Sequence, residues 1–482
     1  MESDQIKKFR QWVVAQAEFK HLLRISEEVG TEIFLVGGIV RDRLLARDTR
    51  DVDLTLSFES LKAARIFADR TGGSFVLLRR EGEMARVVLQ DRTFDFANFR
   101  GPDLEDDLRG RDFTVNAIAF SLIQAFAGGE WVPYDPLGGI KDLRKGLLQM
   151  TAPDCFEKDP LRMLRAFRLS AQLGLNLDSK TRLAIEKFAS SLIRSAAERI
   201  HYEWLMLLSQ PASFISLQVM EQCGLLKVLF PELGDLKGLE QDRYHHLDVF
   251  QHSLLTFHFL EDLIEEAIPL PEDLEREMAS YLEENPKKPW LKWAALLHDL
   301  GKAVTGRLAK GHWTFYGHAG SSQNLFSSLA DRYRLSTREK IFIDRMISWH
   351  MRPLFLVQEL RNQTLTRRAL IRFVREIGPE LNGIFLLALA DSLAAKGKEK
   401  PEDLEDRLKE LWRKALSIRD TVIRPLEIVP PLISGKDLIE MGMTPGPLFK
   451  TILSEIREEQ LEGKVSDRPQ ALEWIKRRVN LD

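Results

Sequence analysis

The feature that most constrains this chain is the order of elements in residues 31–56, TEIFLVGGIVRDRLLARDTRDVDLTL. A β-type run ends in Gly37 and Gly38, a short helical segment with Arg41 follows, and the alternating segment DVDLTL returns as a strand. A strand that ends in glycines and opens a helix lets a phosphate approach backbone N–H groups closely. These residues predict a small α/β unit with a phosphate-binding turn.

The rest of the chain falls into two parts with different sequence patterns. Helix-period patterns at about 4–30 and 60–70, together with β-type segments SFVLL, ARVVLQ and TFDFANF, predict a small N-terminal head with a mixed sheet and helices. After Pro153, helical spacing of apolar residues dominates almost to the end. We therefore expect an α+β protein with a mostly α-helical remainder. Within it, 261–290 is expected to be a surface excursion and 395–420 a solvated helix or linker.

Composition limits the functional classes. The 482 residues are 44% hydrophobic and 29% charged, with a net charge of −3, so any nucleic-acid surface must be local. Cys155 and Cys223 lack metal-ligand spacing, and we expect buried or idle thiols. The N-terminus lacks a signal-peptide core, and we expect no membrane-spanning run and no membrane partner. The predicted location is cytoplasmic.

Asp51 and Asp53 are the first candidate catalytic residues. Residues i and i+2 of a strand point to one face, and two neighbouring carboxylates repel each other unless a cation lies near them. Mg²⁺ binds a few carboxylate oxygens together with water and phosphates. Asp95 offers a third carboxylate from another strand. An isolated Asp-x-Asp is more often an ordinary surface strand, but its place after a Gly-Gly turn favours metal-dependent phosphoryl chemistry.

A long stretch that contains the glycine pair and the acid pair resembles the signature of a known family. LVGGIVRDRLLARDTRDVDL closely resembles the signature of class II nucleotidyltransferases of the polymerase-β superfamily, which are CCA-adding tRNA nucleotidyltransferases and bacterial poly(A) polymerases. RDFTVNAIAF, YDPLGGIKDL, DPLRMLRAFRLSAQLG, AERIHYEWLMLL and PLISGKDLIEMGMTPGP resemble later motifs in the same order. The resemblance implies template-independent addition of C and/or A to the 3′ end of tRNA from CTP and ATP. It implies catalysis by Asp51, Asp53 and Asp95, with Mg²⁺ on Asp51 and Asp53.

The resemblance also implies a nucleotide-binding set. Arg111 and Asp112 would contact the nucleotide, Asp112 at the ribose hydroxyl with Asn116 in support, whereas Gly110 replaces an arginine that the family usually has. An Asp–Arg pair complements the pairing edges of both cytosine and adenine. The full set is Gly37, Gly38, Arg41, Arg111, Asp112, Asn116, Asp159, Arg162, Arg165 and Arg168. A salt-bridged helix start is the plain alternative for Asp159 and Arg162.

Most of the histidines lie between positions 245 and 350. LLHDLGKAVTG resembles the signature of HD-superfamily metal phosphohydrolases, and this implies a metal set of His252, His298, Asp299 and Asp391. His318 and His350 would be extra ligands or phosphate contacts, and Lys302 could meet a phosphate. Imidazole with carboxylate suits Ni, Mn, Co or Fe, with Mg²⁺ as the alternative. Phosphatase or phosphodiesterase activity and a docking role for tRNA both remain open.

These expectations give four regions and several rival functions. The regions are a head (1–150), a helical neck for base selection and RNA binding (151–240), an HD domain (241–395) and a helical tail for contact with the tRNA body (396–482). Basic residues that could follow tRNA phosphates are Arg361, Arg367, Arg368, Arg372, Arg375, Lys436, Lys450 and Lys464. The rivals are a poly(A) polymerase, an A-only or CC-only member of the family, and an HD phosphohydrolase whose head merely binds nucleotide or RNA. The oligomeric state stays open.

Overall fold

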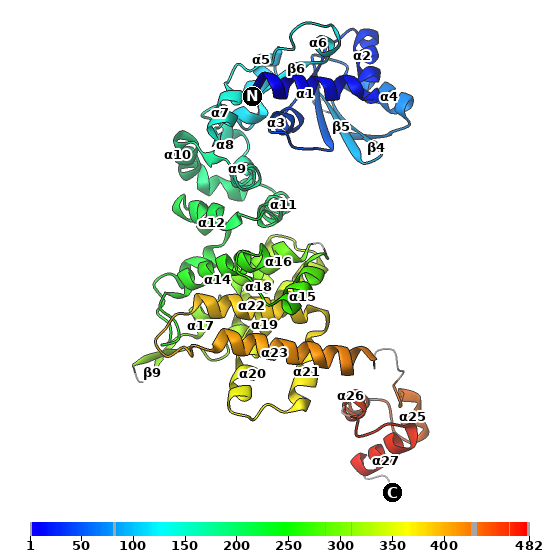
Figure 1. Ribbon diagram of the computed structural model, residues 1–482, viewed down its shortest axis with the longest axis vertical. Helices are drawn as coiled ribbons and strands as arrows, with labels where there is room; N and C mark the ends of the chain where they lie inside the picture. Colours follow the sequence, from blue (N-terminus) through cyan, green and yellow to red (C-terminus); the bar gives the residue numbers. More distant parts are fainter. Residues whose placement is uncertain are drawn as a thin grey trace. The chain divides into compact units, whose positions relative to one another are not determined.

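The three-dimensional structure is a computed structural model (Figure 1). It describes residues 2–80, 83–284, 286–309, 311–425, 431–461 and 463–479. The chain divides into two compact units, residues 1–229 and 230–482, and each is described by itself.

A six-stranded sheet forms the centre of the first unit. Its strands are β1 (Ile33–Val36), β2 (Asp51–Leu56), β3 (Ser74–Arg79), β4 (Met84–Leu89), β5 (Arg92–Asn98) and β6 (Ala119–Ser121). Their order is β3-β4-β5-β2-β1-β6, with β2 and β5 parallel and the other neighbours antiparallel. The predicted mixed sheet in the N-terminal head is therefore confirmed.

The period of two in the strands gives the sheet two different faces. Val52, Leu54, Phe94 and Phe96 alternate onto one face and are buried, and Phe67 of α4 (Ser60–Thr71) packs against both phenylalanines. Helices α1 (Glu2–Ala15) and α2 (Ala17–Val29) precede the sheet, and α3 (Gly38–Leu44) links β1 to β2. The residues between the buried ones, Asp51 and Asp53 among them, belong to the opposite face. The apolar pattern of β2 thus aims its acids away from the core.

Short helices complete the first unit (Figure 1). They are α5 (Leu104–Arg109), η1 (Thr114–Asn116), α6 (Leu122–Phe126), α7 (Gly139–Lys145), α8 (Cys155–Lys158), α9 (Leu161–Leu173), α10 (Ser179–Phe188), η2 (Ala189–Arg194), α11 (Ala197–Leu208), α12 (Ser213–Gln222) and α13 (Leu225–Leu229), with the strand pair β7 (Leu147–Leu148) and β8 (Asn176–Leu177). Helix α9 packs against α11 and α12 through a face that includes Met163, Leu164 and Phe167. Cys155 and Cys223 are free and buried, as predicted.

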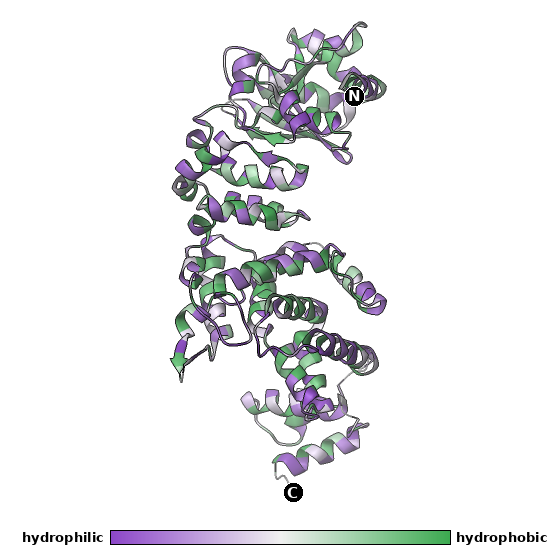
Figure 2. Cartoon of the chain, turned by 60° about the vertical axis from the view of Figure 1, so that its left-hand side comes forward, coloured by the Kyte–Doolittle hydropathy of each residue, from purple (hydrophilic) through white to green (hydrophobic). Residues whose placement is uncertain are grey.

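The second unit is almost entirely helical in the part that the structure describes. Its elements are η3 (Pro231–Leu236), α14 (Val249–Ile264), α15 (Glu272–Leu282), α16 (Lys287–Leu297), α17 (Lys302–Thr305), β9 (Arg307–Ala309), β10 (His312–Thr314), α18 (His318–Arg332), α19 (Thr337–Trp349), α20 (Arg352–Arg361), α21 (Arg367–Ile377), η4 (Gly378–Glu380), α22 (Leu381–Ala394), α23 (Leu404–Ile418), η5 (Arg419–Ile423), α25 (Gly435–Glu440), α26 (Pro447–Leu461) and α27 (Arg468–Val479). Helix α22 is buried along nearly its whole length and packs against α14, α16 and α23. Most helices show one hydrophobic and one hydrophilic side, as Figure 2 shows.

One helical run of the described chain, 367–394, is long and apolar enough to cross a membrane by length and composition alone. It is interrupted by η4, and 78% of its most apolar window is buried inside the protein. We therefore interpret it as a core element of the second unit rather than a membrane segment.

Two local expectations need correction. Residues 261–290 are not merely a surface excursion, because α15 buries Leu274, Met278 and Tyr281 and packs against α22. The charged segment 395–420 does contain a helix, but α23 buries Leu411 and Trp412. Charge on one side of these helices masked the apolar stripe on the other.

Candidate active site and metal centre

The predicted glycine turn lies beside the paired acids of β2. The Gly38 N–H donates to Asp53 Oδ2 at 3.2 Å, because β1 and β2 are neighbours with Val36 opposite Asp53. Gly37 has φ +72° and ψ −135°, and a Cβ atom there would lie 2.7 Å from Asp53 Oδ2. Glycine is therefore required at this position for its backbone angles and for the space that it leaves.

The three predicted carboxylates share one sheet face but have different partners. Asp95 is opposite Asp53 across the parallel β2–β5 pair, and Asp51 accepts a hydrogen bond from the Thr93 hydroxyl. Burial raises the pKa of Asp53; Asp95 and Asp51 raise it further, while Arg111 and the Gly38 N–H oppose the rise. A divalent cation would relieve this repulsion, so Asp51 and Asp53 fit a metal-binding role.

Arg86 is a residue of this site that the sequence analysis missed. It lies on β4 opposite Asp95, and its Nε and Nη2 donate to the two Asp95 oxygens, both at 2.7 Å. Asp95 is thus held by an arginine in this structure. A charged side chain at position 86, between the buried Ala85 and Val87, was the available signal.

Arg41, Arg111, Asp112 and Asn116 come together on the other side of β2. Asp112 accepts from Asn116 Nδ2 at 2.9 Å, and Asn116 Oδ1 accepts from Arg41 Nη1 at 2.6 Å. Arg111 pairs with Asp107 at 2.9 Å and lies over Gly37. Burial would raise the pKa of Asp112, but Arg165 and Asn116 bring it below its ordinary value. The site therefore holds an ionised Asp112 within a network of donors.

Arginines of α9 reach this network. Arg165 lies 3.2 Å from Asp112 Oδ2, and Arg162 donates to the carbonyl oxygens of Gly110 at 2.8 Å and Arg111 at 3.1 Å. Arg162 and Arg165 both face the segment 110–112, because they are about one helical turn apart. Gly110 supplies a carbonyl here, and a Cβ atom at this position would make only ordinary contacts.

The charged residues predicted at the start of the neck pair with residues of α11 in the structure. Asp159 pairs with Arg199 of α11 at 3.1 Å, and its contact with Arg162 is a backbone hydrogen bond, in which the Arg162 N–H donates to the Asp159 carbonyl oxygen at 3.1 Å. Arg165 and Arg168 both pair with Glu203 of α11, at 3.0 and 2.7 Å. Glu203 is 2% exposed, and the sequence analysis did not single it out. These ion pairs hold the side chains of Arg165 and Arg168 in place before any ligand binds.

The second unit gathers the predicted HD residues into one buried cluster. His252 Nε2 lies 2.9 Å from Asp391 Oδ1, and His298 Nε2 lies 3.2 Å from Asp299 Oδ2. His318 Nε2 lies 3.3 Å from the other Asp299 oxygen. The cluster combines α14, the end of α16, the start of α18 and α22, which explains why its residues are so far apart in sequence.

Hydrogen bonds to backbone carbonyl oxygens orient the imidazoles of this cluster. The Nδ1 atoms of His298, His318 and His350 lie 2.9, 2.9 and 2.6 Å from backbone carbonyl oxygens, so in the neutral rings the proton is on Nδ1. Their Nε2 lone pairs then point inward, and the His318 and His350 Nε2 atoms lie 3.2 Å apart. Asp299 Oδ1, Asp299 Oδ2 and His298 Nε2 make no hydrogen bond of regular geometry, although charged or ionisable groups lie close to both Asp299 oxygens. Converging acceptors of this kind fit a cation.

Burial controls the charge of this cluster. It lowers the pKa of His252 to about 4 and that of His350 to about 3, so both rings are neutral near neutral pH. Burial would raise the pKa of Asp299, but His298 and Lys302 hold it well below its ordinary value. Lys302 Nζ lies 2.6 Å from Asp299 Oδ2. His245, which the sequence analysis did not include, joins His252 and Asp391 as a possible ligand.

The predicted RNA-contact residues divide into paired and exposed cations. Arg361 pairs with Asp403, Lys464 with Glu459, and Arg368 and Arg375 with Glu458. Arg367, Arg372, Lys436 and Lys450 are exposed. The first group is partly neutralised within the protein, so the exposed group is the better candidate for phosphate contact.

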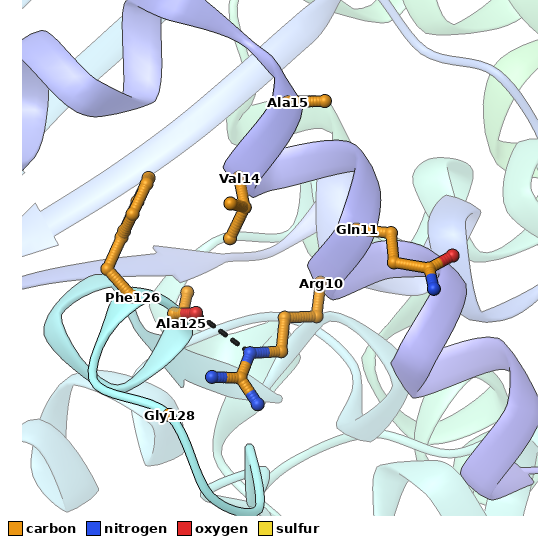
Figure 3. Close-up of a pocket in the computed structure, with 7 residues that line it drawn as sticks. All are labelled: Arg10, Gln11, Val14, Ala15, Ala125, Phe126 and Gly128. Carbon is orange, nitrogen blue, oxygen red and sulfur yellow. Dashed lines mark hydrogen bonds between the residues drawn. The ribbon is translucent and has the colours of Figure 1, made fainter.

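A pocket in the first unit lies apart from these residues. It is formed by α1 and the segment 125–128, and Arg10 Nε donates there to the Ala125 carbonyl at 2.8 Å (Figure 3). None of the predicted site residues lines it. Arg10 binds the end of α6 through this hydrogen bond, so we assign no function to the pocket.

Comparison with known proteins agrees with this geometry. Residues 33–149 match the family described as the poly(A) polymerase head domain, 174–236 match the probable RNA and SrmB-binding site of polymerase A, and 249–396 match the HD domain. The A-adding tRNA nucleotidyltransferase of Deinococcus radiodurans is 33% identical over 92% of this chain and 94% of its own length. The CC-adding tRNA nucleotidyltransferase of Thermus thermophilus is 32% identical over 92% and 93%.

Solved structures share the fold. A CCA-adding enzyme in complex with CTP has a TM-score of 0.64 at 21% identity and covers 98% of both chains. The Thermotoga maritima CCA-adding enzyme complexed with tRNA has a TM-score of 0.60 at 20% identity over 98% of both chains. Together, the fold and the acid-bearing sheet define a nucleotidyltransferase with a poly(A)-polymerase-type head and an HD domain. The chain belongs to the tRNA nucleotidyltransferase family.

Proposed function

We propose that this protein adds C and/or A to the 3′ end of tRNA, from CTP and ATP and without a nucleic-acid template. The observation that carries the proposal is the position of Asp53, which shares an open sheet face with Asp51 and lies 3.2 Å from the Gly38 N–H. Phosphate-binding N–H groups and metal-binding acids are thus adjacent, as nucleotidyl transfer requires. Mg²⁺ held by Asp51 and Asp53 would supply charge stabilisation to the transferring phosphoryl group.

The proposed nucleotide site continues from the glycine turn to α9. The donors of Arg41 and Arg111 serve the triphosphate, and Asp112 accepts from the ribose hydroxyl, with Asn116 fixing its carboxylate. Asp159 accepts from the exocyclic amine of cytosine or adenine, and Arg162 donates to the neighbouring ring nitrogen. Arg165 and Arg168 set the position of this surface through Glu203. Asp95 is the third acid of the reaction centre.

The relatives favour addition of C and/or A to tRNA over poly(A) synthesis and over an HD phosphohydrolase with a nucleotide-binding head. The A-adding and CC-adding enzymes named above match over nearly their whole lengths, and the multifunctional CCA protein of Pasteurella multocida is 28% identical over 80% of this chain and 90% of its own length. Neither poly(A) synthesis nor an HD phosphohydrolase with a nucleotide-binding head receives comparable support. We infer a cytoplasmic enzyme with four regions, 1–150, 151–240, 241–395 and 396–482; the family matches support the order of these regions.

The test gives purified enzyme three tRNA transcripts that end before CCA, after C and after CC, with CTP or ATP supplied separately. Wild-type protein should extend at least one transcript, and the products separate full CCA, CC-only and A-only addition. Asp51→Ala and Asp53→Ala should abolish incorporation of labelled nucleotide while tRNA binding is largely retained. Turnover by either variant would reject the assignment.

We further propose that the HD cluster binds a divalent metal, Ni, Mn, Co, Fe or Mg, through His252, His298, Asp299 and Asp391. The inward Nε2 lone pairs and the buried Asp299 carboxylate, whose oxygens make no hydrogen bond of regular geometry, support this proposal. A bound metal would activate water for hydrolysis of a phosphate ester at an RNA end. A chromogenic phosphodiester incubated with the protein and each metal in turn tests the activity. Absence of hydrolysis with every metal would favour a docking role.

A further inference from the structure

The reaction centre has two unlike sides along the sheet. On the β1 side of β2 lie the Gly37–Gly38 turn and Arg111. On the β5 side lie Asp95 and then Arg86 of β4. In nucleotidyl transfer the attacking and leaving oxygens are roughly in line, on opposite sides of the phosphorus atom. With the triphosphate at the glycine turn, the attacking 3′ hydroxyl must enter from the β5 side.

The strand register shows which residues an RNA end would meet on that side. Asp53 is opposite Asp95, Asp95 is opposite Arg86, and Arg86 is opposite Val76 of β3. A second row on the same face of the sheet, two residues along β2 from the first, runs from Asp51 through Thr93 to Val88. At strand spacings of about 4.8 Å, this face extends about 14 Å from the acids to β3. It is therefore continuous with the reaction centre.

This part of the face is open and chemically mixed. Val76 is 44% exposed, Val88 is 38% exposed, and the side chain of Arg86 between them is 41% exposed. On the opposite face of β4, Ala85 and Val87 are fully buried. The exposed valines offer apolar contact for ribose and base, and Arg86 offers positive charge close to the RNA backbone.

We propose that Val76, Arg86 and Val88, here named the primer face, seat the last nucleotides of the RNA that is extended. Arg86 also positions Asp95 through its two hydrogen bonds. The proposal rests on the proposed nucleotidyl transfer. The primer face is the RNA-binding side of the reaction centre. RNA occupies it because this face is continuous with Asp51 and Asp53, where the 3′ hydroxyl reacts.

Val76→Glu and Val88→Glu test the primer face, because a carboxylate there would repel phosphates. The matched control is Leu77→Glu: Leu77 is 41% exposed, adjacent on the same strand and aligned with Ala85 on the opposite face. In full-length enzyme, each primer-face variant should raise KM for tRNA at least tenfold. KM for CTP or ATP and kcat at saturating tRNA should stay near wild type, as should all constants of the control.

The outcomes separate this proposal from the function on which it rests. If wild-type enzyme extends no tRNA, the proposed function fails. If wild type is active but KM for tRNA is the same in Val76→Glu, Val88→Glu and Leu77→Glu, the primer face is wrong. Thermal unfolding of each variant checks its fold.

A crosslinking measurement on wild-type protein removes the dependence on variant folding. A tRNA with 4-thiouridine at the position before its 3′ end should crosslink to a peptide within residues 74–89. Crosslinking elsewhere, or none, would overturn the proposal.

Discussion

Gly37→Ala tests the link between the glycine turn and catalysis. The alanine Cβ would lie 2.7 Å from Asp53 Oδ2 and 3.2 Å from Arg111 Nη1. To restore an ordinary contact of 3.4 Å, the Asp53 carboxylate must retreat by about 0.7 Å. A misplacement of about 1 Å can cost roughly a hundredfold in rate. We therefore expect kcat to fall on the order of a hundredfold, and stability to fall by about 1–3 kcal/mol from backbone strain.

Gly72→Ala is the matched control. Gly72 also has φ +72°, but a Cβ atom there would meet nothing within 4 Å. This change should cost about 1–2 kcal/mol of stability with little effect on kcat. Single-turnover incorporation of labelled nucleotide and thermal unfolding measure both quantities. If Gly37→Ala retained the kcat of Gly72→Ala, the close approach of the turn to Asp53 would have no catalytic role.

Three further predictions concern buried charges. Glu203→Gln should lower stability by about 1–3 kcal/mol and raise KM for the nucleotide, because Arg165 loses a charged partner. Urea unfolding measures the stability and steady-state kinetics measure KM. Unchanged stability and KM would contradict this prediction. Chelation followed by Mn²⁺ at a hundred times its dissociation constant should restore about 2.7 kcal/mol of stability, and His298→Ala should abolish that gain; an equal gain in the variant would exclude His298 as a ligand. In metal-free protein, the pKa of His252 is about 4 and that of His350 is about 3, whereas the ordinary value is 6.5. Between the lowered pKa of each ring and 6.5, the unfolded chain therefore binds more protons than the folded protein. Stability should therefore fall as the pH is lowered from 7 to 5, and a rise over that range in denaturant titrations would refute the charge assignment.

The elements of the head could be predicted from the sequence because their signals are local, whereas the HD residues were predicted from the resemblance of LLHDLGKAVTG to a family signature. The alternation in DVDLTL puts Asp51 and Asp53 on one face of any strand, and the glycines after β1 permit a turn that other residues cannot adopt. Partners of charged residues could not be predicted in the same way. Asp159 lies one helical turn from Arg162, yet it pairs with Arg199.

What the sequence by itself determined is the order of strands and helices in the head and the acid pair, since each follows from spacing along one chain segment. Only the tertiary structure decided that Arg86 holds Asp95 and that Glu203 holds Arg165 and Arg168. The same holds for the inward direction of the histidine Nε2 atoms. These contacts join segments far apart in sequence, and their energies depend on burial, which spacing along the chain does not specify.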